Sequence, residues 1–284
     1  MKHIFKASFT NNGRCNTRMN ITIASDNHSM NDLTAIIGGS ALSQLPGLHI
    51  KERRVVRTPF GEPSGVLIFG QIGEAAVVFL ARNGYGRTIL PHLINYRANI
   101  WAMRSVDVDR IIAVSSVSSL DSVSGTGTLV IPDQIIDYTT GRDSTFYDNS
   151  EHEIIPLDFT NPFDETIRHA LLEAAQLHGV AVAASGTYAC TQGPRLQTAA
   201  EMQRSLRDGA HIVGQTVMPE AVLARELEIP YAMLALITNR SQMAGITPQQ
   251  PFGRPPTHTG SPKALTDLQG VLAHTVRHMT VINS

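Results

Sequence analysis

The sequence predicts an α/β fold, with a single domain built on a central mixed, mainly parallel sheet that is flanked by helices. Short apolar runs that suit strands alternate with helix-like segments through much of the 284-residue chain. Several of these runs are continuously apolar, which is typical of strands that are buried on both faces of a sheet. Hydrophobic residues make up 42% of the chain, which is ample for a core of that kind.

The first half of this domain carries strand signals on both sides of one helix. We expect strands at 33–37, 66–69, 75–81 and 111–114, where apolar runs are followed by glycine, arginine or serine. Residues 91–104 are expected to form a helix, because their apolar residues recur three and four positions apart and Pro91 suits the first turn.

The second half alternates in the same way. Helices are expected at 163–178, 198–206, 219–227 and 263–280, and strands at 180–184, 211–213 and 231–237. Before the last helix, residues 246–262 are rich in proline and glycine and show no periodic apolar positions. We interpret this stretch as an irregular surface loop and not as a domain boundary.

Residues 1–31 differ in character from the rest of the chain. They are largely polar and lack the apolar stretch of roughly 7–15 residues that a secretory signal needs. We therefore expect a flexible N-terminal extension over 1–31, followed by one domain over 32–284. No apolar run elsewhere approaches the ~20 residues that span a bilayer, so we expect no membrane-spanning helix.

Charge and cysteine content narrow the class of partner. The formal net charge is −1 and no block of lysine and arginine stands out, which argues against nucleic acid or an anionic membrane as the main partner. The two cysteines, Cys15 and Cys190, are too few for a disulfide framework or a zinc site. We expect a protein of the reducing cytoplasm.

Small and polar residues follow several of the expected strands, and ligands of open α/β sheets bind at the carboxyl ends of strands. The segments are Gly38-Gly39-Ser40, Arg82-Asn83-Gly84, Ser115-Ser116, Gly214-Gln215-Thr216 and Thr238-Asn239. Glycine lets backbone N–H groups approach an anion, hydroxyls donate to its oxygens, and arginine offers a planar fork of donors. This set suits inorganic phosphate better than a nucleoside triphosphate, because the chain has no Walker lysine motif. Taken singly, each segment also fits an ordinary turn, a polar loop or a structural salt bridge.

Together these segments resemble the family of methylthioadenosine and purine nucleoside phosphorylases. The resemblance covers residues 33–242, most of the chain. It is carried, in this order, by AIIGGS at 35–40, TPFGEPS at 58–64, FLAR at 79–82, NYRANIWA at 95–102, IPDQ at 131–134, STFYD at 144–148, GTY at 186–188, GPR at 193–195 and MPE at 218–220.

This resemblance implies a nucleoside phosphorylase fold and an enzyme of purine salvage that cleaves a purine nucleoside with inorganic phosphate. It also implies a homotrimer with sites near subunit interfaces, and no metal or organic cofactor beside the phosphate co-substrate. The implied phosphate-binding residues are Ser40, Arg82, Asn83, Ser115, Ser116 and Thr216, and the implied nucleoside-binding residues are Leu196, Gln197, Gln215, Asn239 and Ser241. Of these, Arg82 and Asn239 are the implied catalytic residues. His92 either reaches a site across an interface or is a structural histidine.

Several positions depart from the family pattern. Asn83 stands for a histidine, Gln192 for a glutamate, and Gln215 for a methionine that packs against the sugar. These changes bear on rate and on the preferred sugar more than on the fold. They keep open a catalytically weak family member that binds a nucleoside.

Asn239 bears on the choice of base. Family members that act on 6-aminopurines usually carry aspartate here, whereas an amide donates to a 6-oxo group and offers no carboxyl chemistry at N7 of adenine. We therefore predict a 6-oxopurine substrate, namely 5′-methylthioinosine, inosine or guanosine. In this respect the chain resembles the bacterial S-methyl-5′-thioinosine phosphorylases. The alternative is a 5′-methylthioadenosine phosphorylase.

Overall fold

The computed structural model describes residues 4–8, 20–24, 32–39, 42, 45–120, 125–147, 156–240 and 260–282. The chain divides into two units, Met1–Asn31 and Asp32–Ser284. In the first unit, strands β1 (Ile4–Ser8) and β2 (Asn20–Ala24) pair antiparallel. The sequence patterns did not predict this pair, which lies in the stretch expected to be an extension.

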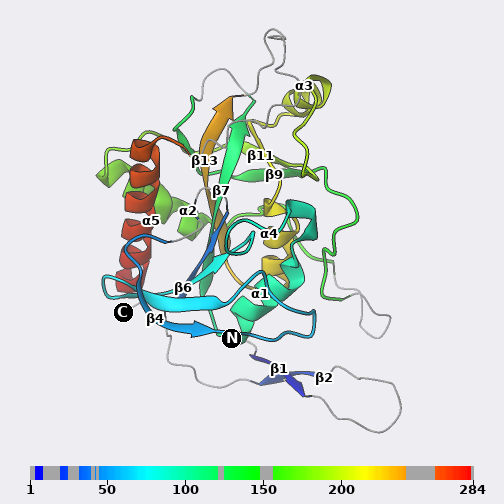
Figure 1. Cartoon of the computed structure of the whole chain (residues 1–284), viewed down its shortest axis with the longest axis vertical. Coiled ribbons are helices and arrows are strands. Elements are labelled where there is room, and N and C mark those ends of the chain that lie inside the picture. The colour runs from blue at the N-terminus through cyan, green and yellow to red at the C-terminus, as the bar shows by residue number, and fades with distance from the viewer. Residues whose placement is uncertain are drawn as a thin grey trace. The chain divides into compact units, whose positions relative to one another are not determined.

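The second unit is built on a mixed sheet with 11 strands among its described residues (Figure 1). Eight of them follow one another in the order β10 (Val182–Ala183), β8 (Leu129–Val130), β13 (Tyr231–Arg240), β7 (Arg110–Ser119), β3 (Thr34–Gly38), β6 (Ala75–Ala81), β5 (Leu67–Ile72) and β4 (His49–Arg54). Off this path, β12 (Ile212–Gly214) pairs with β7, and β11 (Thr187–Cys190) pairs with β12 and β9 (Gln134–Asp137). The central strands β13, β7, β3 and β6 are all parallel to their neighbours in this set, so the predicted architecture is confirmed.

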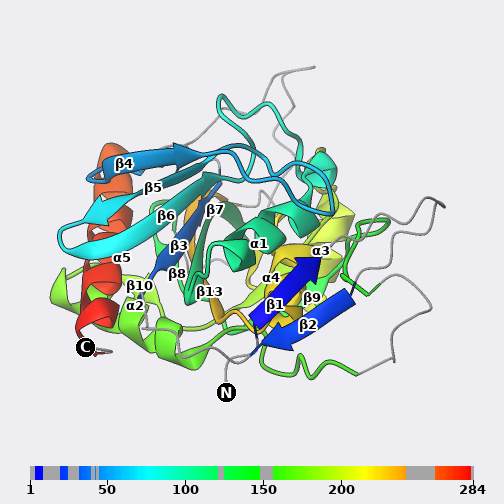
Figure 2. The same cartoon turned by 90° about the horizontal axis from the view of Figure 1, so that it is seen from below.

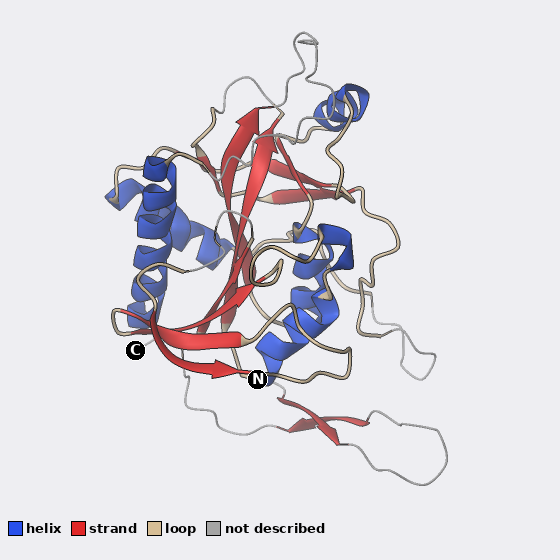
Figure 3. Ribbon diagram, in the orientation of Figure 1, coloured by secondary structure: helices blue, strands red, loops and turns tan. Residues whose placement is uncertain are grey.

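Helices cover both faces of the sheet, as Figures 2 and 3 show. On one face lie α1 (Tyr96–Ser105) and α4 (Val217–Glu226), and on the other lie α2 (Glu165–Leu177) and α5 (Pro262–Ile282). The remaining described helices are α3 (Ala199–Arg207) and the short 3-10 helix η1 (Pro91–Leu93). None of the helices in the described part of the chain is long and apolar enough to cross a membrane.

Two apolar clusters pack on the two faces of the sheet. In β3, Ala35 and Ile37 belong to the cluster that includes residues of α1 and α4, whereas Ile36 belongs to the cluster that includes residues of α2 and α5. All three side chains are fully buried. Burial on both faces explains why Ala35, Ile36 and Ile37 are apolar in succession.

Capping residues decide where two of the expected helices begin. The expected helix 91–104 is divided into η1 and α1, since Asn95 caps the second element and its Oδ1 accepts a hydrogen bond from the Ala98 N–H at 3.0 Å. By contrast, the helix expected at 198–206 is α3, which begins with a capping box between Thr198 and Glu201.

The two central strands β7 and β13 extend further than predicted. Their parallel pairing continues through Ala235 opposite Ser115 and Leu236 opposite Ser116. Ser115, Ser116 and Asn239 therefore lie in strands, where the sequence had indicated loops. The Pro- and Gly-rich stretch expected to be a loop falls largely within 241–259, outside the described residues.

Candidate active site

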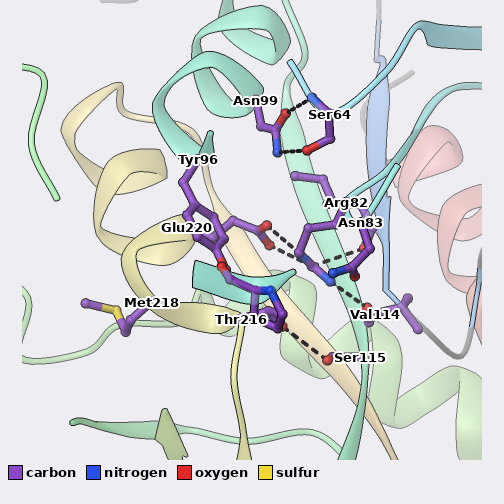
Figure 4. Close-up of polar contacts among 12 residues, drawn as sticks. Ser64, Arg82, Asn83, Tyr96, Asn99, Val114, Ser115, Thr216, Met218 and Glu220 are labelled. Carbon is purple, nitrogen blue, oxygen red and sulfur yellow. Dashed lines mark hydrogen bonds and ion pairs between the residues drawn. The ribbon is translucent and has the colours of Figure 1, made fainter. Parts of the chain in front are cut away.

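Two hydroxyl groups meet where β7 and the start of α4 come together. Ser115 Oγ, on β7, lies 3.2 Å from Thr216 Oγ1, and either hydroxyl can donate (Figure 4). Thr216 is the N-cap residue of α4, yet its side chain makes no capping hydrogen bond. The pair is 101 residues apart in sequence. The backbone at Met218, two residues on, is extended (φ −110°, ψ 136°), so α4 is not regular at its start. The two buried hydroxyls can themselves donate to an anion.

The residue that follows β3, Gly39, lies against Arg82 and Val114. A side chain at Gly39 would put its Cβ 2.9 Å from Nη1 of Arg82 and 3.0 Å from the Val114 carbonyl oxygen. Glycine is therefore required for this close approach of the backbone to the guanidinium. Ser40, the next residue and an implied phosphate ligand, lies outside the described residues, as does Ser241.

Arg82 differs from the expectation of an open fork of donors. Its side chain is 1% exposed, and Nε and Nη2 donate to the two carboxylate oxygens of Glu220 at 2.6 and 2.7 Å. Nη2 also donates to the Ile37 carbonyl, and Nη1 donates to the Val114 carbonyl. Within the described residues, one N–H of Nη1 is left for a ligand. Arg82 can thus offer phosphate a single donor, because the fork itself holds Glu220, whose carboxylate balances the guanidinium charge.

Charge in this cluster is balanced inside the protein. Burial lowers the pKa of the Arg82 guanidinium, but the Glu220 carboxylate outweighs this effect, so the pKa of Arg82 stands above its usual value. The Tyr231 hydroxyl also donates to Glu220, at 2.9 Å. Because both Glu220 oxygens accept from Arg82 and Tyr231 in turn donates to Glu220, the guanidinium is fixed in orientation against Glu220.

Two other implied phosphate residues, Asn83 and Ser116, are less buried than Arg82. Asn83 is half-buried, and its amide donates to the Ile89 carbonyl at 2.9 Å, which stabilises the turn after β6. Ser116 is half-buried on β7 beside Ser115. Nδ1 of His92, on η1, is buried and has no hydrogen-bond partner among the described residues. The structure thus brings together Arg82, Ser115 and Thr216, which the sequence had named separately.

Three implied nucleoside-binding residues lie on the loop between β11 and α3 or contact it. Leu196 is 56% exposed, and Gln197 donates a hydrogen bond to the Thr191 hydroxyl. Gln215 reaches this loop from the strand side, since its amide donates to the Arg195 carbonyl at 3.0 Å. A Cβ on Gly193 would lie 2.4 Å from the Gln215 amide oxygen, so the two residues are in direct contact. The Gln215 amide therefore has a hydrogen-bond partner in the loop, which it supports.

A cavity of about 320 Å³ lies between this loop and α3. Its lining is polar and comprises Tyr138, Thr191, Gln192, Gly193, Arg195, Gln197, Glu201, Arg204 and Ser205. The charged side chains in it are already engaged, because Arg195 forms a double hydrogen bond with Glu201 and Arg204 pairs with Asp208.

Asn239 lies at an irregular point of β13. The register with β7 shifts between Ile237 and Asn239, so that Asn239 is opposite Ser118 and Thr238 is the extra residue. Bulges of this kind redirect side chains and are frequent beside active sites. The Asn239 side chain is half-buried, and among the described residues its amide makes one long contact, of 3.5 Å, with the Thr238 hydroxyl. The amide therefore retains hydrogen-bonding capacity for a ligand.

Sequence reasoning missed two residues that organise this region. Glu220 stood in the quoted MPE segment, but its pairing with Arg82 joins positions 138 residues apart. Arg142 follows β9 and bonds to the loop that carries Gln192. The available signals for Glu220 were its MPE segment and its place in the helix expected at 219–227, and none of the motifs singled out in the sequence includes Arg142.

Comparisons with known proteins agree on one family. A family model described as "Phosphorylase superfamily" matches residues 34–254. A Pseudomonas syringae protein named "Probable S-methyl-5'-thioinosine phosphorylase" is 47% identical over 205 residues, which cover 72% of this chain and 83% of that protein. A Pyrococcus furiosus protein named "6-oxopurine nucleoside phosphorylase" is 47% identical over 210 residues, covering 72% and 78%. Among solved structures, methylthioadenosine phosphorylase from Schistosoma mansoni in complex with adenine is similar with a TM-score of 0.79 and 29% identity, covering 88% of this chain and 92% of that one.

Proposed function

This chain belongs to the phosphorylase superfamily, and from that premise we propose that it cleaves a 6-oxopurine nucleoside with inorganic phosphate. The products are the free purine base and a ribose-1-phosphate derivative. The observation that carries the proposal is the buried hydroxyl pair of Ser115 and Thr216 beside the fixed guanidinium of Arg82. That arrangement suits a small anion, and the similar proteins of known name are nucleoside phosphorylases.

In the proposed reaction, phosphate attacks C1′ of the ribose while the bond from C1′ to the purine breaks. A phosphate oxygen forms the new bond, and the electron pair of the old bond leaves with the purine. Ser115, Thr216 and the remaining Nη1 donor of Arg82 hold the attacking phosphate, so their contribution is positioning. The Asn239 amide donates to the purine, where negative charge develops as it leaves. The reaction needs neither a metal nor an organic cofactor, so dialysis against EDTA leaves the rate unchanged.

Asn239 also supports the choice of a 6-oxopurine. A side-chain amide donates to O6, whereas a 6-amino group would meet the donor face of the amide or require it to turn. A mismatched donor in a buried site costs about 1–3 kcal/mol, which is roughly ten- to a hundredfold in kcat/KM. We propose 5′-methylthioinosine, inosine or guanosine as the substrate. The similar proteins at 47% identity are named for 6-oxopurine substrates.

A second candidate is phosphorolysis of 5′-methylthioadenosine, which the likeness to the Schistosoma mansoni enzyme favours. The third is a weakly catalytic nucleoside-binding protein, which the amides at Asn83, Gln192 and Gln215 favour. One experiment separates the three. The protein is incubated with inosine, guanosine, 5′-methylthioinosine, adenosine and 5′-methylthioadenosine, with and without phosphate, and the released base is quantified. Phosphate-dependent release from the 6-oxo nucleosides is expected; faster release of adenine supports the second candidate, and nucleoside binding without release supports the third.

We further propose a homotrimer that acts in the cytoplasm in purine salvage. Support for the assembly comes from the family resemblance and from exposed apolar side chains such as Leu90 and Leu93, at 44% and 65% exposure beside α1. Light scattering is expected to give about three times the chain mass of 30.8 kDa. A fully active monomer would contradict this assembly.

A further inference from the structure

Arg142 uses its whole guanidinium to join parts of the chain that are distant in sequence. Nε donates to the Gln192 side-chain oxygen at 3.2 Å, and Nη2 donates to the carbonyls of Gln192 and Thr191 at 2.8 and 3.4 Å. Nη1 donates to the Met218 carbonyl at 2.5 Å and to the Tyr96 hydroxyl at 3.2 Å. All five N–H donors of the side chain thus have acceptors.

The acceptors belong to the two sides of the candidate site. Met218 lies midway between Thr216, whose hydroxyl meets Ser115, and Glu220, which holds Arg82 (Figure 4). Thr191 and Gln192 begin the loop 191–197, on which Leu196 and Gln197 lie. The position of one backbone segment relative to the other is therefore determined in part by a single side chain.

Other contacts at Arg142 restrict its movement. Its guanidinium lies over the Tyr96 ring, 5.4 Å from the centroid, and the side chain is half-buried. The Gln192 side-chain oxygen accepts a second hydrogen bond, from the Thr140 N–H at 3.1 Å, so Gln192 is itself held by the segment that carries Arg142. Backbone carbonyls are well matched by the rigid fork of an arginine, which a lysine does not reproduce.

We propose that Arg142 is a positioning residue, which holds the purine-side loop 191–197 in register with the phosphate-side segment 216–220. This inference rests on the proposed function, because it assigns the two segments to the two substrates. Phosphate and the sugar carbon must approach in line, and a displacement of about 1 Å between reactants costs about a hundredfold in rate. The two segments each remain able to bind their substrate without the clamp, so the loss falls on kcat.

The test uses Arg142→Met and Arg142→Lys in the full-length protein, with Arg54→Met as the matched control. Arg54 is also an arginine over an aromatic ring, 4.4 Å from the centroid of Phe69, and it lies on β4, outside the candidate site. For each protein, kcat and the KM values for phosphate and for the best nucleoside are measured. The accessibility of the loop is followed separately, by mass spectrometry of trypsin cleavage after Arg195 in the native protein.

Arg142→Met is expected to lower kcat about a hundredfold, with both KM values changed by less than about fivefold. Cleavage after Arg195 is expected to accelerate about tenfold, because three hydrogen bonds to the start of the loop are lost. Arg142→Lys is expected to retain less than about a tenth of the wild-type kcat, and it decides the matter if Arg142→Met does not fold. Arg54→Met is expected to match wild type in both assays.

The proposal is overturned if Arg142→Lys has the wild-type kcat, if loop cleavage is unchanged, or if Arg54→Met loses as much activity as Arg142→Met. A wild-type protein without phosphate-dependent cleavage would refute the proposed function instead. In that case the trypsin assay still decides whether Arg142 clamps the loop.

Discussion

Replacing Arg82 with methionine removes one half of a fully buried ion pair. Arg82 and Glu220 have side chains that are 1% and 0% exposed and are joined by hydrogen bonds of 2.6 and 2.7 Å. In Arg82→Met, the Glu220 carboxylate stays buried, with the Tyr231 hydroxyl as its remaining described partner. Leaving one charge of such a pair without its partner costs about 3–5 kcal/mol.

That cost translates into a large change in melting temperature. For a domain of this size, each kcal/mol shifts Tm by about 2–4 °C, so a decrease of roughly 6–20 °C is expected. The double variant Arg82→Met/Glu220→Met removes both charges, and an apolar pair in such a position is often neutral relative to the ion pair. It leaves the Tyr231 hydroxyl without its acceptor, at about 1–3 kcal/mol. The double variant should therefore be more stable than Arg82→Met.

Calorimetry at one protein concentration measures the Tm values, and initial rates measure phosphate affinity. Arg54→Met serves as a control, because Arg54 pairs with Glu52 at the surface, where both side chains are about half exposed and little change in Tm is expected. The single and the double variant both lack the Arg82 guanidinium. Both should therefore raise the KM for phosphate far more than the KM for nucleoside, although the double variant restores packing. A single variant within 2 °C of wild type by this assay, or a double variant less stable than the single one, would refute the reasoning.

Three further predictions concern the hydroxyl pair, the base and acid stability. Ser115→Ala and Thr216→Ala should each raise the KM for phosphate about tenfold in initial-rate measurements, and the double variant should fall short of the product because the two hydroxyls contact each other; unchanged KM values would exclude them as ligands. Asn239→Asp should shrink the preference for inosine over adenosine in kcat/KM, because a carboxylate repels O6; an unchanged ratio would mean that Asn239 does not select the base. Hydrogen bonds from Arg195 lower the pKa of Glu201 to about 2 from an unfolded value near 4.5. The stabilisation is therefore present above pH 4.5 and lost as pH falls toward 2, so the Tm difference between wild type and Glu201→Gln should vanish over that range; a constant difference would contradict the pairing.

Local patterns were sufficient to predict a segment whose surroundings are the same along its whole length. The strand predicted at 75–81 is β6 with the same bounds. Both of its faces are covered by the core, and every position is apolar. The helix start at Thr198 was also visible, since a capping box is a contact between residues three apart. The paired strands β9 and β11 were not predicted, because each has only 4 residues and they pair across more than fifty positions.

Polar residues near the site led to a wrong prediction of where β7 ends. Ser115 and Ser116 have the composition of a loop, yet they continue β7 because its neighbour β13 supplies backbone partners on through Leu236. A strand's end is determined by where its neighbour stops pairing, and that information lies elsewhere in the chain.

The sequence by itself determined the α/β class, the family and the identity of most residues named for the candidate site, through motifs that survive as short runs. Only the tertiary structure decided what those residues do to one another. It turned the fork of Arg82 toward Glu220, placed Ser115 against Thr216, and engaged Arg142 with carbonyls of two separate segments. The physical reason is that a guanidinium or hydroxyl has several possible acceptors, and burial beside groups that are distant in sequence selects among them.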